Sequence, residues 1–398
     1  MQITPHISPQ REMDTQYVTE KVEALYGDLN LPKDYFDYVD NEVFVNLSSE
    51  EDENLRTLVS RVDAIMRQAY IYAYEERYIR LDEYRPWLDR FRQEYPYDEH
   101  FIARYDAVFD KNGVIKFVEN NANTPGMQLE SMYFSDWLTP AGYTSHANRI
   151  RSSILDFWRR KRDEKGLKNI AILTAYTFEE EDHLVCRTYA EILSEIFEPS
   201  SLVVGDIYDM HIVDGQVFVR GIPVDAVLSY FPLEFFLTDY EFADDFFQVV
   251  FDGGCFLANP IESIILQDKG LFATIHEHKS KFSEEDQLII EQHIPYTQRK
   301  MPDSSDGWIA KWRFGRYGRE IYKAHFEGEI VEESHYIYQQ YFEPQSINDK
   351  NDFLVFSIYT TMREVLGYIV RRQFRHTTDD RDNVVTMVYT DNTKSFIG

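Results

Sequence analysis

Four polar residues lie beside a predicted turn, and three of them, Asp106, Glu119 and Asn121, have the oxygen atoms and the spacing to bind a metal ion. Arg104 and Asp106 lie in one β-rich run, Glu119 and Asn121 lie in the next, and Asn112-Gly113 separates the two runs. Asn-Gly between β-rich runs is a strong hairpin signal, because a type I′ turn needs positive φ at both central residues. The sequence therefore predicts a β-hairpin that carries these four side chains.

The register of the hairpin decides whether the four groups can act together. With Asn112-Gly113 as a two-residue turn, Asp106 lies opposite Glu119 and Arg104 lies opposite Asn121, all on one face. Opposed carboxylates repel each other, so the pattern favours a divalent cation, and Mg²⁺ is typically held by one or two carboxylates plus substrate phosphates. A shift of two residues would leave an ordinary ion pair between Arg104 and Glu119, and a shift of one would remove the site. A polar hairpin face without a metal remains the alternative.

Two lysines later in the chain could supply the cations of a phosphate site. Lys311 lies on a predicted strand just ahead of a glycine-containing loop, and such loops can bring backbone N–H groups close to phosphates. The glycines and arginines of this loop are Gly315, Arg316, Gly318 and Arg319. Lys269 lies in an apolar, helix-like stretch and could simply extend to the surface. Nucleotide sites need Mg²⁺ ligands and phosphate-binding cations together. A phosphate-binding role for the two lysines is therefore supported only in combination with the carboxylates of the hairpin.

Composition limits the class of protein. A chain of 398 residues with 43% hydrophobic residues can form two or three domains with a large core. The formal net charge of −28 argues against nucleic acid or an anionic membrane as a partner. Only Cys186 and Cys255 occur, which we interpret as core residues. Because the sequence starts without a signal-peptide pattern and has no long apolar run, we expect a soluble, cytoplasmic protein.

Hydrophobic periodicity and turn signals predict a mixed fold in three parts. Helices are predicted over 15–26, 48–69, 82–94, 127–133, 146–162 and 184–196, and in a stretch that carries Asp268-Lys269. Strands are predicted over 170–174, 201–204, 212–219 (a hairpin turned at Asp214-Gly215), 224–231, 308–312 and 336–341. The alternation of strands and helices in the middle of the chain favours a small α/β subdomain with a largely parallel sheet. The expected domains are 1–165, a helical region plus the metal-binding hairpin; 166–258, the subdomain; and 259–398, a strand-rich nucleotide-binding part.

The motifs together resemble the glutathionylspermidine synthetase family. The resemblance rests on R-x-D, a turn and then E-x-N-A-N-T-P, followed in the same order by further segments. These are the acidic run 179–182, Tyr230-Phe231-Pro232-Leu233-Glu234-Phe235, Asn259-Pro260 with Lys269, Lys311 before its loop, Tyr338-Gln339-Gln340-Tyr341, and Thr390-Asp391-Asn392-Thr393. The family implies an ATP-grasp fold of the permuted glutathione-synthetase-like type with an inserted α/β subdomain.

The resemblance also implies an activity and roles for individual residues. It implies an ATP- and Mg²⁺-dependent ligase that phosphorylates a carboxylate and lets an amine displace the phosphate, forming an amide and releasing ADP. The implied Mg²⁺ ligands are Asp106, Glu119 and Asn121. The implied ATP-binding residues are Lys269, Lys311, Gly315, Arg316, Gly318, Gln339, Gln340 and Tyr341, the last three through the backbone near the adenine. Arg104 would neutralise the transferred phosphoryl group or the acyl phosphate, and Glu180 and Glu181 would bind substrate.

Several departures from the family pattern leave alternatives open. Asn123 stands where the family usually has Asp, and Tyr317 interrupts the glycine loop. The family's late arginine has four candidates, Arg371, Arg372, Arg375 and Arg381, of which we favour Arg371. A nucleotide-binding module without ligase chemistry is the second hypothesis, and a phosphotransferase that stops at the phosphorylated acid is the third. The expected partners are a small-molecule or peptide-like carboxylate and a polyamine or amino acid. No amidase domain is expected, and a homo-oligomer is compatible with the sequence.

Overall fold

The structure is a computed structural model that describes most of the chain. The described residues are 5–9, 15–27, 35–40, 42–75, 84–94, 100–175, 180–316, 321–323, 333–349, 351–361, 364–373 and 383–391. They form a mixed α/β fold with several separate sheets, as the sequence predicts.

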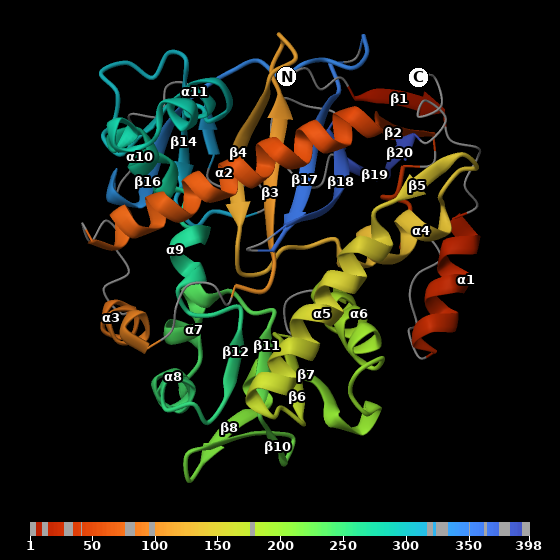
Figure 1. The fold of residues 1–398 in the computed structure, drawn as a ribbon, viewed down its shortest axis with the longest axis vertical. Helices are drawn as coiled ribbons and strands as arrows, with labels where there is room; N and C mark the ends of the chain where they lie inside the picture. The colour runs from red at the N-terminus through yellow and green to blue at the C-terminus, as the bar shows by residue number, and fades with distance from the viewer. Residues whose placement is uncertain are drawn as a thin grey trace.

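A five-stranded antiparallel sheet stands in the middle of the upper half of Figure 1. Its order is β19 (Asn383–Thr386), β18 (Val365–Gln373), β17 (Phe353–Thr360), β3 (Ala103–Phe109) and β4 (Ile115–Asn121). The long helix α2 (Ser49–Glu75) crosses the front of the sheet in Figure 1. The predicted capping box is present, since Ser48 Oγ accepts from Glu51 N–H while the Glu51 carboxylate accepts from Ser48 N–H.

The predicted hairpin is β3 and β4, but its turn is longer than expected. Asp110 N–H donates to Val114 O and Gly113 N–H donates to Asp110 O, so three residues form the turn, with Gly113 at φ 75°. Pairing next to this turn is therefore shifted by one residue relative to the two-residue prediction. A bulge at Val118 restores the predicted register, and Asp106 pairs with Glu119. The predicted opposition is confirmed, although the predicted turn is wrong.

A second antiparallel sheet packs with helices beside the hairpin. Its order is β13 (Thr297–Gln298), β16 (Tyr336–Gln340), β14 (Trp308–Trp312) and β15 (Ile321–Lys323). The helices are α9 (Ser263–Gln267), α10 (Gly270–Glu277) and α11 (Glu284–His293). The expectation that Asp268 and Lys269 lie within one helix is wrong, because Asp268 has ψ 114° and separates α9 from α10. Lys269 is the residue that precedes α10.

The lower part of Figure 1 contains the predicted parallel sheet. Its order is β12 (Phe256–Ala258), β11 (Ala226–Ser229), β6 (Ile170–Thr174) and β7 (Leu202–Asp206), and every pair is parallel. Its helices are α5 (Ala147–Lys165), α6 (Glu180–Leu193), α7 (Leu233–Asp239) and α8 (Ala243–Phe251). A small sheet of β10 (Ile222–Val224), β9 (Gln216–Val219) and β8 (Met210–Val213) is attached, with the predicted turn at Asp214 (φ 50°) and Gly215 (φ 75°).

A further sheet pairs strands from the N-terminal and C-terminal parts of the described chain. A four-stranded sheet has the order β1 (His6–Pro9), β2 (Val43–Ser48), β20 (Val388–Asp391) and β5 (Tyr143–Ser145). The helices are α1 (Thr15–Tyr26), α3 (Arg85–Glu94) and α4 (Ser135–Trp137). The predicted helix over 127–133 is present as a helical stretch that begins after Met127 (φ 66°) and runs through a π-helical turn at Glu130–Phe134 into α4.

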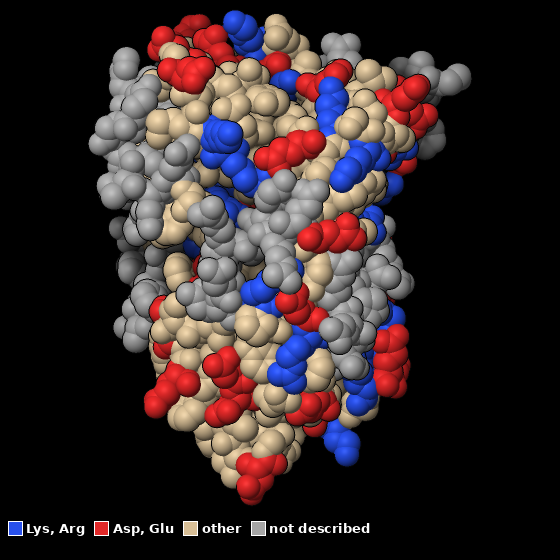
Figure 2. Space-filling view, turned by 90° about the vertical axis from the view of Figure 1, so that its left-hand side faces the viewer, with Lys and Arg blue, Asp and Glu red and all other residues tan. Residues whose placement is uncertain are grey.

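The burial of the cysteines and the charges on the surface can be compared with the expectations from composition. Both cysteines are buried, and burial raises the pKa of each thiol. Acidic and basic side chains are interspersed on the face drawn in Figure 2. Within the described part of the chain, we find no helix of the length and hydrophobicity needed to span a membrane.

Candidate active site

Adjacent strands of the central sheet bring polar side chains onto one face. Across this face, Ser357 of β17 pairs with Asp106 of β3, which pairs with Glu119 of β4. Arg104 pairs with Asn121 in the neighbouring row. Because side chains alternate along a strand, these residues share one face. The predicted constellation is therefore assembled at the end of the hairpin opposite its turn.

Asp106 is the centre of this face and is held between two guanidinium groups. Its carboxylate accepts from Arg104 Nε and Nη2 at 2.9 Å each, from Arg371 Nη2 at 2.6 Å, and from Ser357 Oγ at 3.0 Å. The residue is only 3% exposed. Burial alone would raise the pKa of Asp106, but the two arginines outweigh burial and lower the pKa below its usual value. Asp106 is thus an ionised carboxylate with cations on both oxygens.

Glu119 is neutralised by Lys269, the first predicted phosphate lysine. Lys269 Nζ lies 2.8 Å from Glu119 Oε1 and donates to Gly315 O at 2.7 Å. The lysine is 4% exposed, so the alternative that it simply extends to the surface is excluded. The contact brings the start of the predicted phosphate loop next to the hairpin.

A buried ion pair fixes the backbone around Lys269. Asp268 accepts from Arg313 Nε at 2.9 Å, and a second bond joins Asp268 to Arg313 Nη2. Lys269 N–H also donates to Arg313 O at 3.1 Å. A Cβ atom at Gly270 would lie 2.9 Å from Arg313 Nε, so glycine is required for this close approach. Asp268 Oδ1 also accepts from Gly270 N–H at 2.7 Å, so the same carboxylate caps the start of α10 where the helix breaks.

Lys311, the second predicted lysine, also points to the hairpin. Lys311 Nζ donates to Gln339 Oε1 at 2.8 Å and to Val118 O at 3.4 Å. Burial lowers the pKa of Lys311 to about 8, although Glu119 acts in the opposite direction. At neutral pH the amine is therefore still mostly protonated, and its proton is lost in mildly alkaline solution.

The first arginine of the predicted loop contacts two other segments. Arg316 donates to the buried Glu234 at 2.6 and 2.8 Å and to Thr124 Oγ1 at 2.7 Å. Asn123 Nδ2 donates to the other oxygen of Glu234 at 3.3 Å. An aspartate at position 123 would place a second negative charge beside Glu234, which gives a physical reason for asparagine here. Sequence reasoning noted the segment around Glu234 but assigned it no contact.

Two of the four candidates for the late arginine lie on opposite faces of β18. Arg371 points to Asp106, whereas Arg372 points to the other face, with its Nη1 3.3 Å from Asp40. Arg375 and Arg381 lie outside the described residues. Of the four candidates, Arg371 is thus placed at the predicted site and Arg372 is not.

The other predicted site residues are placed less decisively. Gln339 is buried, Gln340 is exposed, and Tyr341 N–H donates to Gly307 O at 2.8 Å. Gly318 lies outside the described residues. Glu180 begins α6, and Glu181 is exposed in its first turn. The structure therefore leaves the adenine and substrate assignments as predictions.

Charges around the hairpin do not cancel. The cations are Arg104, Lys269, Lys311 and Arg371, and the anions are Asp106 and Glu119. Four cations against these two carboxylates leave two more positive than negative charges among the six side chains, and the buried Glu130 is a further acidic group that acts on Arg104. The nearby Asp268–Arg313 and Glu234–Arg316 pairs contribute no net charge. An excess of this sign and position suits a polyanionic ligand such as a nucleoside triphosphate.

The oxygen donors of the hairpin fit Mg²⁺ if a phosphate binds with it. Asp106, Glu119 and Asn121 offer two carboxylates and one amide oxygen, which are hard ligands. Among the described residues, no group of three or more His, Cys, Asp or Glu side chains could hold a metal. A cation here would therefore depend on phosphate oxygens for further ligands, and phosphates would also draw the arginines and lysines away from the carboxylates.

Comparison with known families decides the affiliation. The sequence profile described as "Glutathionylspermidine synthase preATP-grasp" matches residues 7–389. The chain belongs to this family. No curated protein sequence matches the chain significantly. Membership in the glutathionylspermidine synthase family supports a glutathione synthetase-like ligase, the coarse form of the predicted activity.

One solved structure supports the same fold at low sequence identity, and a second is a weaker match. A glutathione synthetase-like effector from Globodera pallida in its apo form has a TM-score of 0.57 and 12% identity, covering 95% of this chain and 98% of that one. A putative gamma-glutamylcysteine synthetase from Methylobacillus flagellatus KT has a TM-score of 0.46 and 11% identity, covering 83% and 86%. The first likeness supports the ATP-grasp fold that the sequence predicts for this glutathionylspermidine synthase family member.

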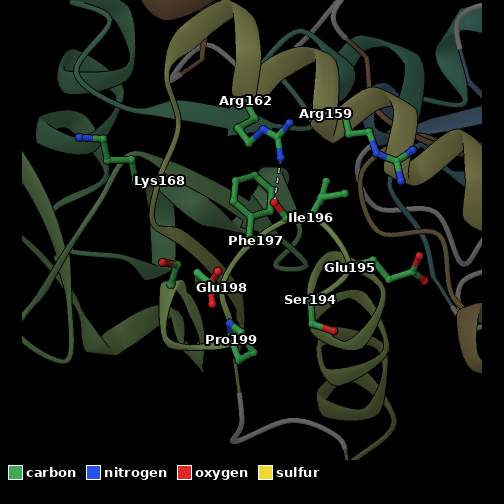
Figure 3. A pocket seen from close by; sticks show the side chains of 10 residues that line it. Arg159, Arg162, Lys168, Ser194, Glu195, Ile196, Phe197, Glu198 and Pro199 are labelled. Atoms are coloured by element: carbon green, nitrogen blue, oxygen red, sulfur yellow. Dashed lines mark hydrogen bonds between the residues drawn. The ribbon is translucent and has the colours of Figure 1, made fainter.

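A separate hollow on the parallel-sheet side does not include these residues. It has a volume of about 720 Å³ and is shown in Figure 3. Its lining comes from the end of α5, from Lys168 and from the connection between α6 and β7, and contains the basic residues Arg159, Arg162 and Lys168. Arg159 pairs with Asp156, and Arg162 donates to Ile196 O. Both arginines therefore have partners within the chain.

Proposed function

We propose that the protein is an ATP- and Mg²⁺-dependent carboxylate–amine ligase. The γ-phosphoryl group of ATP is transferred to a carboxylate oxygen of the acid, which gives an acyl phosphate and ADP. The amine nitrogen then attacks the acyl carbon, phosphate leaves, and the nitrogen loses a proton to give the amide. The observation that carries the proposal is the excess of positive charge around two paired carboxylates on the hairpin.

Each charged group has a role that follows from its position. Lys269 and Lys311 bind the ATP phosphates, and Gly315, the first residue of the predicted phosphate loop, accepts from Lys269. Arg104 and Arg371 converge on one point and stabilise negative charge on the transferred group. Asp106, Glu119 and Asn121 would hold Mg²⁺, which would supply positive charge toward the phosphates.

The substrate assignments extend the same proposal. Asp106, Glu119 and Asn121 are the proposed Mg²⁺ ligands. Glu181 is exposed at the start of α6, where its negative charge suits an amine substrate, and Glu180 is adjacent to it. The acid is a small-molecule or peptide-like carboxylate, and the amine is a polyamine or an amino acid.

Hydroxylamine separates the proposed ligase from its alternatives. With ATP, Mg²⁺ and a panel of acids, hydroxylamine intercepts an acyl phosphate and produces a hydroxamate. A ligase gives hydroxamate with hydroxylamine and amide with the natural amine. A phosphotransferase gives hydroxamate but no amide with any amine, and a module that only binds nucleotide gives neither.

The two neighbouring late arginines provide a paired prediction. Arg371→Gln should lower turnover by about 10²–10³-fold, because it removes one of the two cations on the reacting face. Arg372→Gln removes the same charge from the next residue, on the opposite face of β18, and should leave turnover close to wild type. Steady-state ADP release from both variants at matched folded concentration makes the comparison. Equal losses in the two variants would contradict the assignment of Arg371.

The affinity for ATP should depend on pH through Lys311. Burial lowers the pKa of this lysine to about 8, so its charge is present below that pH and is lost above it. The dissociation constant for Mg·ATP should therefore rise as the pH increases through about 8. Lys311→Arg should remove this dependence, since arginine stays protonated throughout the range. Calorimetric titrations from pH 6.5 to about 9.5 measure the dissociation constant. If Lys311→Arg shows the same pH dependence as wild type, a group other than Lys311 causes it.

A further inference from the structure

We propose that Gln339 is a positioning residue whose side-chain carbonyl holds the ammonium group of Lys311 at the hairpin. The proposal assigns a task to the side chain of Gln339, whereas the family resemblance implied only a backbone contact near the adenine. It rests on the proposed function for the identity of the bound anion, but the placement of Lys311 stands on the contacts themselves.

A chain of three hydrogen bonds fixes the direction of the Gln339 amide. Thr297 Oγ1 donates to Pro295 O at 2.8 Å, Gln339 Nε2 donates to Thr297 Oγ1 at 3.1 Å, and Lys311 Nζ donates to Gln339 Oε1 at 2.8 Å. The backbone carbonyl of Pro295 can only accept. The hydroxyl proton of Thr297 is therefore directed to Pro295, its oxygen accepts from the Gln339 amide nitrogen, and the Gln339 carbonyl must face Lys311.

Three adjacent strands hold the chain rigidly. Thr297 of β13 pairs with Gln339 of β16, and Gln339 pairs with Ile309 of β14, two residues before Lys311. Thr297 and Gln339 are each 1% exposed, and Lys311 is 7% exposed. Water therefore has little access to replace these bonds, and loss of one member leaves its neighbour without that partner.

The two lysines differ in the charge of the group that holds them. Lys269 is held by the carboxylate of Glu119, whereas Lys311 is held by the neutral amide of Gln339. The positive charge of Lys311 is therefore not cancelled by its anchor, although Glu119 and Asp106 act on it from the hairpin and Lys269 opposes them. A neutral anchor aligns the ammonium group and leaves its charge available to an incoming anion.

The test compares variants that keep volume but remove one bond. Gln339→Met removes the carbonyl, Thr297→Val removes the hydroxyl that orients the amide, and Thr297→Ser restores that hydroxyl. In the free protein, the NMR signal of the Lys311 ζ-ammonium group, assigned with Lys311→Arg, should persist in wild type and Thr297→Ser. It should broaden or disappear in Gln339→Met and Thr297→Val, because the ammonium group then exchanges faster with water.

Nucleotide affinity provides the second readout. Calorimetric titration with Mg·ATP should show binding weakened by about tenfold in Gln339→Met and Thr297→Val, the scale of one hydrogen bond to a charged group. Thr297→Ser should bind as wild type does. The matched control is Gln298→Met on the same sheet, since Gln298 pairs with Tyr338 and its amide donates outward to Lys300 O. This control should change neither readout.

The outcomes separate this inference from the proposed function. An unchanged Lys311 signal in Gln339→Met would overturn the positioning role, and so would equal effects of Thr297→Ser and Thr297→Val on Mg·ATP affinity. If the NMR signal responds as expected but wild-type protein binds no Mg·ATP, the placement of Lys311 is supported and the proposed function fails.

Discussion

Replacing Asp106 by asparagine is expected to lower ATP turnover by about 10²–10³-fold, the scale seen when one preorganised charged or polar group is removed. Asparagine keeps the size of the side chain but removes the charge on which Arg104 and Arg371 converge. It also removes a proposed Mg²⁺ ligand. ADP release measured with saturating Mg·ATP checks the prediction.

The same substitution should also destabilise the protein. Asp106 is nearly fully buried, and removal of one partner from a buried ion pair costs about 3–5 kcal/mol. Turnover must therefore be compared at equal concentrations of folded protein, measured by thermal denaturation. Ser357→Ala is the matched control, because it removes one hydrogen bond to the same carboxylate and leaves its charge. The control should cost about 1 kcal/mol and retain most turnover. Wild-type turnover in folded Asp106→Asn would contradict the role of Asp106.

The second large effect is expected on stability alone. Asp268→Ala should lower the free energy of unfolding by about 3–5 kcal/mol, because it leaves the guanidinium of Arg313 buried without its carboxylate. Chemical denaturation with urea measures the change. The matched control is Asp209→Ala, which breaks the exposed Arg220–Asp209 pair at the surface. An exposed pair contributes about 0–1 kcal/mol, so this variant should unfold close to wild type.

Loss of Asp268 should also affect Lys269. The ion pair fixes the loop whose backbone binds Lys269 N–H, so the folded fraction of Asp268→Ala should bind Mg·ATP more weakly than Asp209→Ala does. Equal stabilities of the two aspartate variants would show that the Asp268–Arg313 pair does not anchor this region.

For the hairpin, the sequence predicts the position of the turn and the pairing of the two carboxylates, but not the turn length or the bulge. Asn112-Gly113 correctly locates the turn, and Asp106 does oppose Glu119. The route to that register was not predictable, because the three-residue turn shifts the pairing by one and the bulge at Val118 shifts it back. Val118 is an ordinary strand residue in the sequence, and nothing local marks it as the extra one.

Contacts between distant segments account for the other differences. The stretch around Lys269 has the apolar pattern of a continuous helix, and it breaks at Asp268, whose carboxylate accepts from Gly270 N–H and also binds Arg313, 45 residues later. Ser357 lies in an apolar strand, and only the pairing of β17 with β3 brings it to Asp106. Glu234 likewise gains its role from Arg316. Local patterns predict the elements, whereas these partners depend on how the elements pack.

The most direct test of the proposed ligase is ADP release with Mg·ATP against panels of acids and amines. Wild-type protein should release ADP at a substantial rate only when a suitable acid and a suitable amine are both present, and the amide should form in equal amount. The folded Asp106→Asn protein should lose this release. ADP release that needs no acid, or that proceeds equally well in Asp106→Asn, would contradict the account.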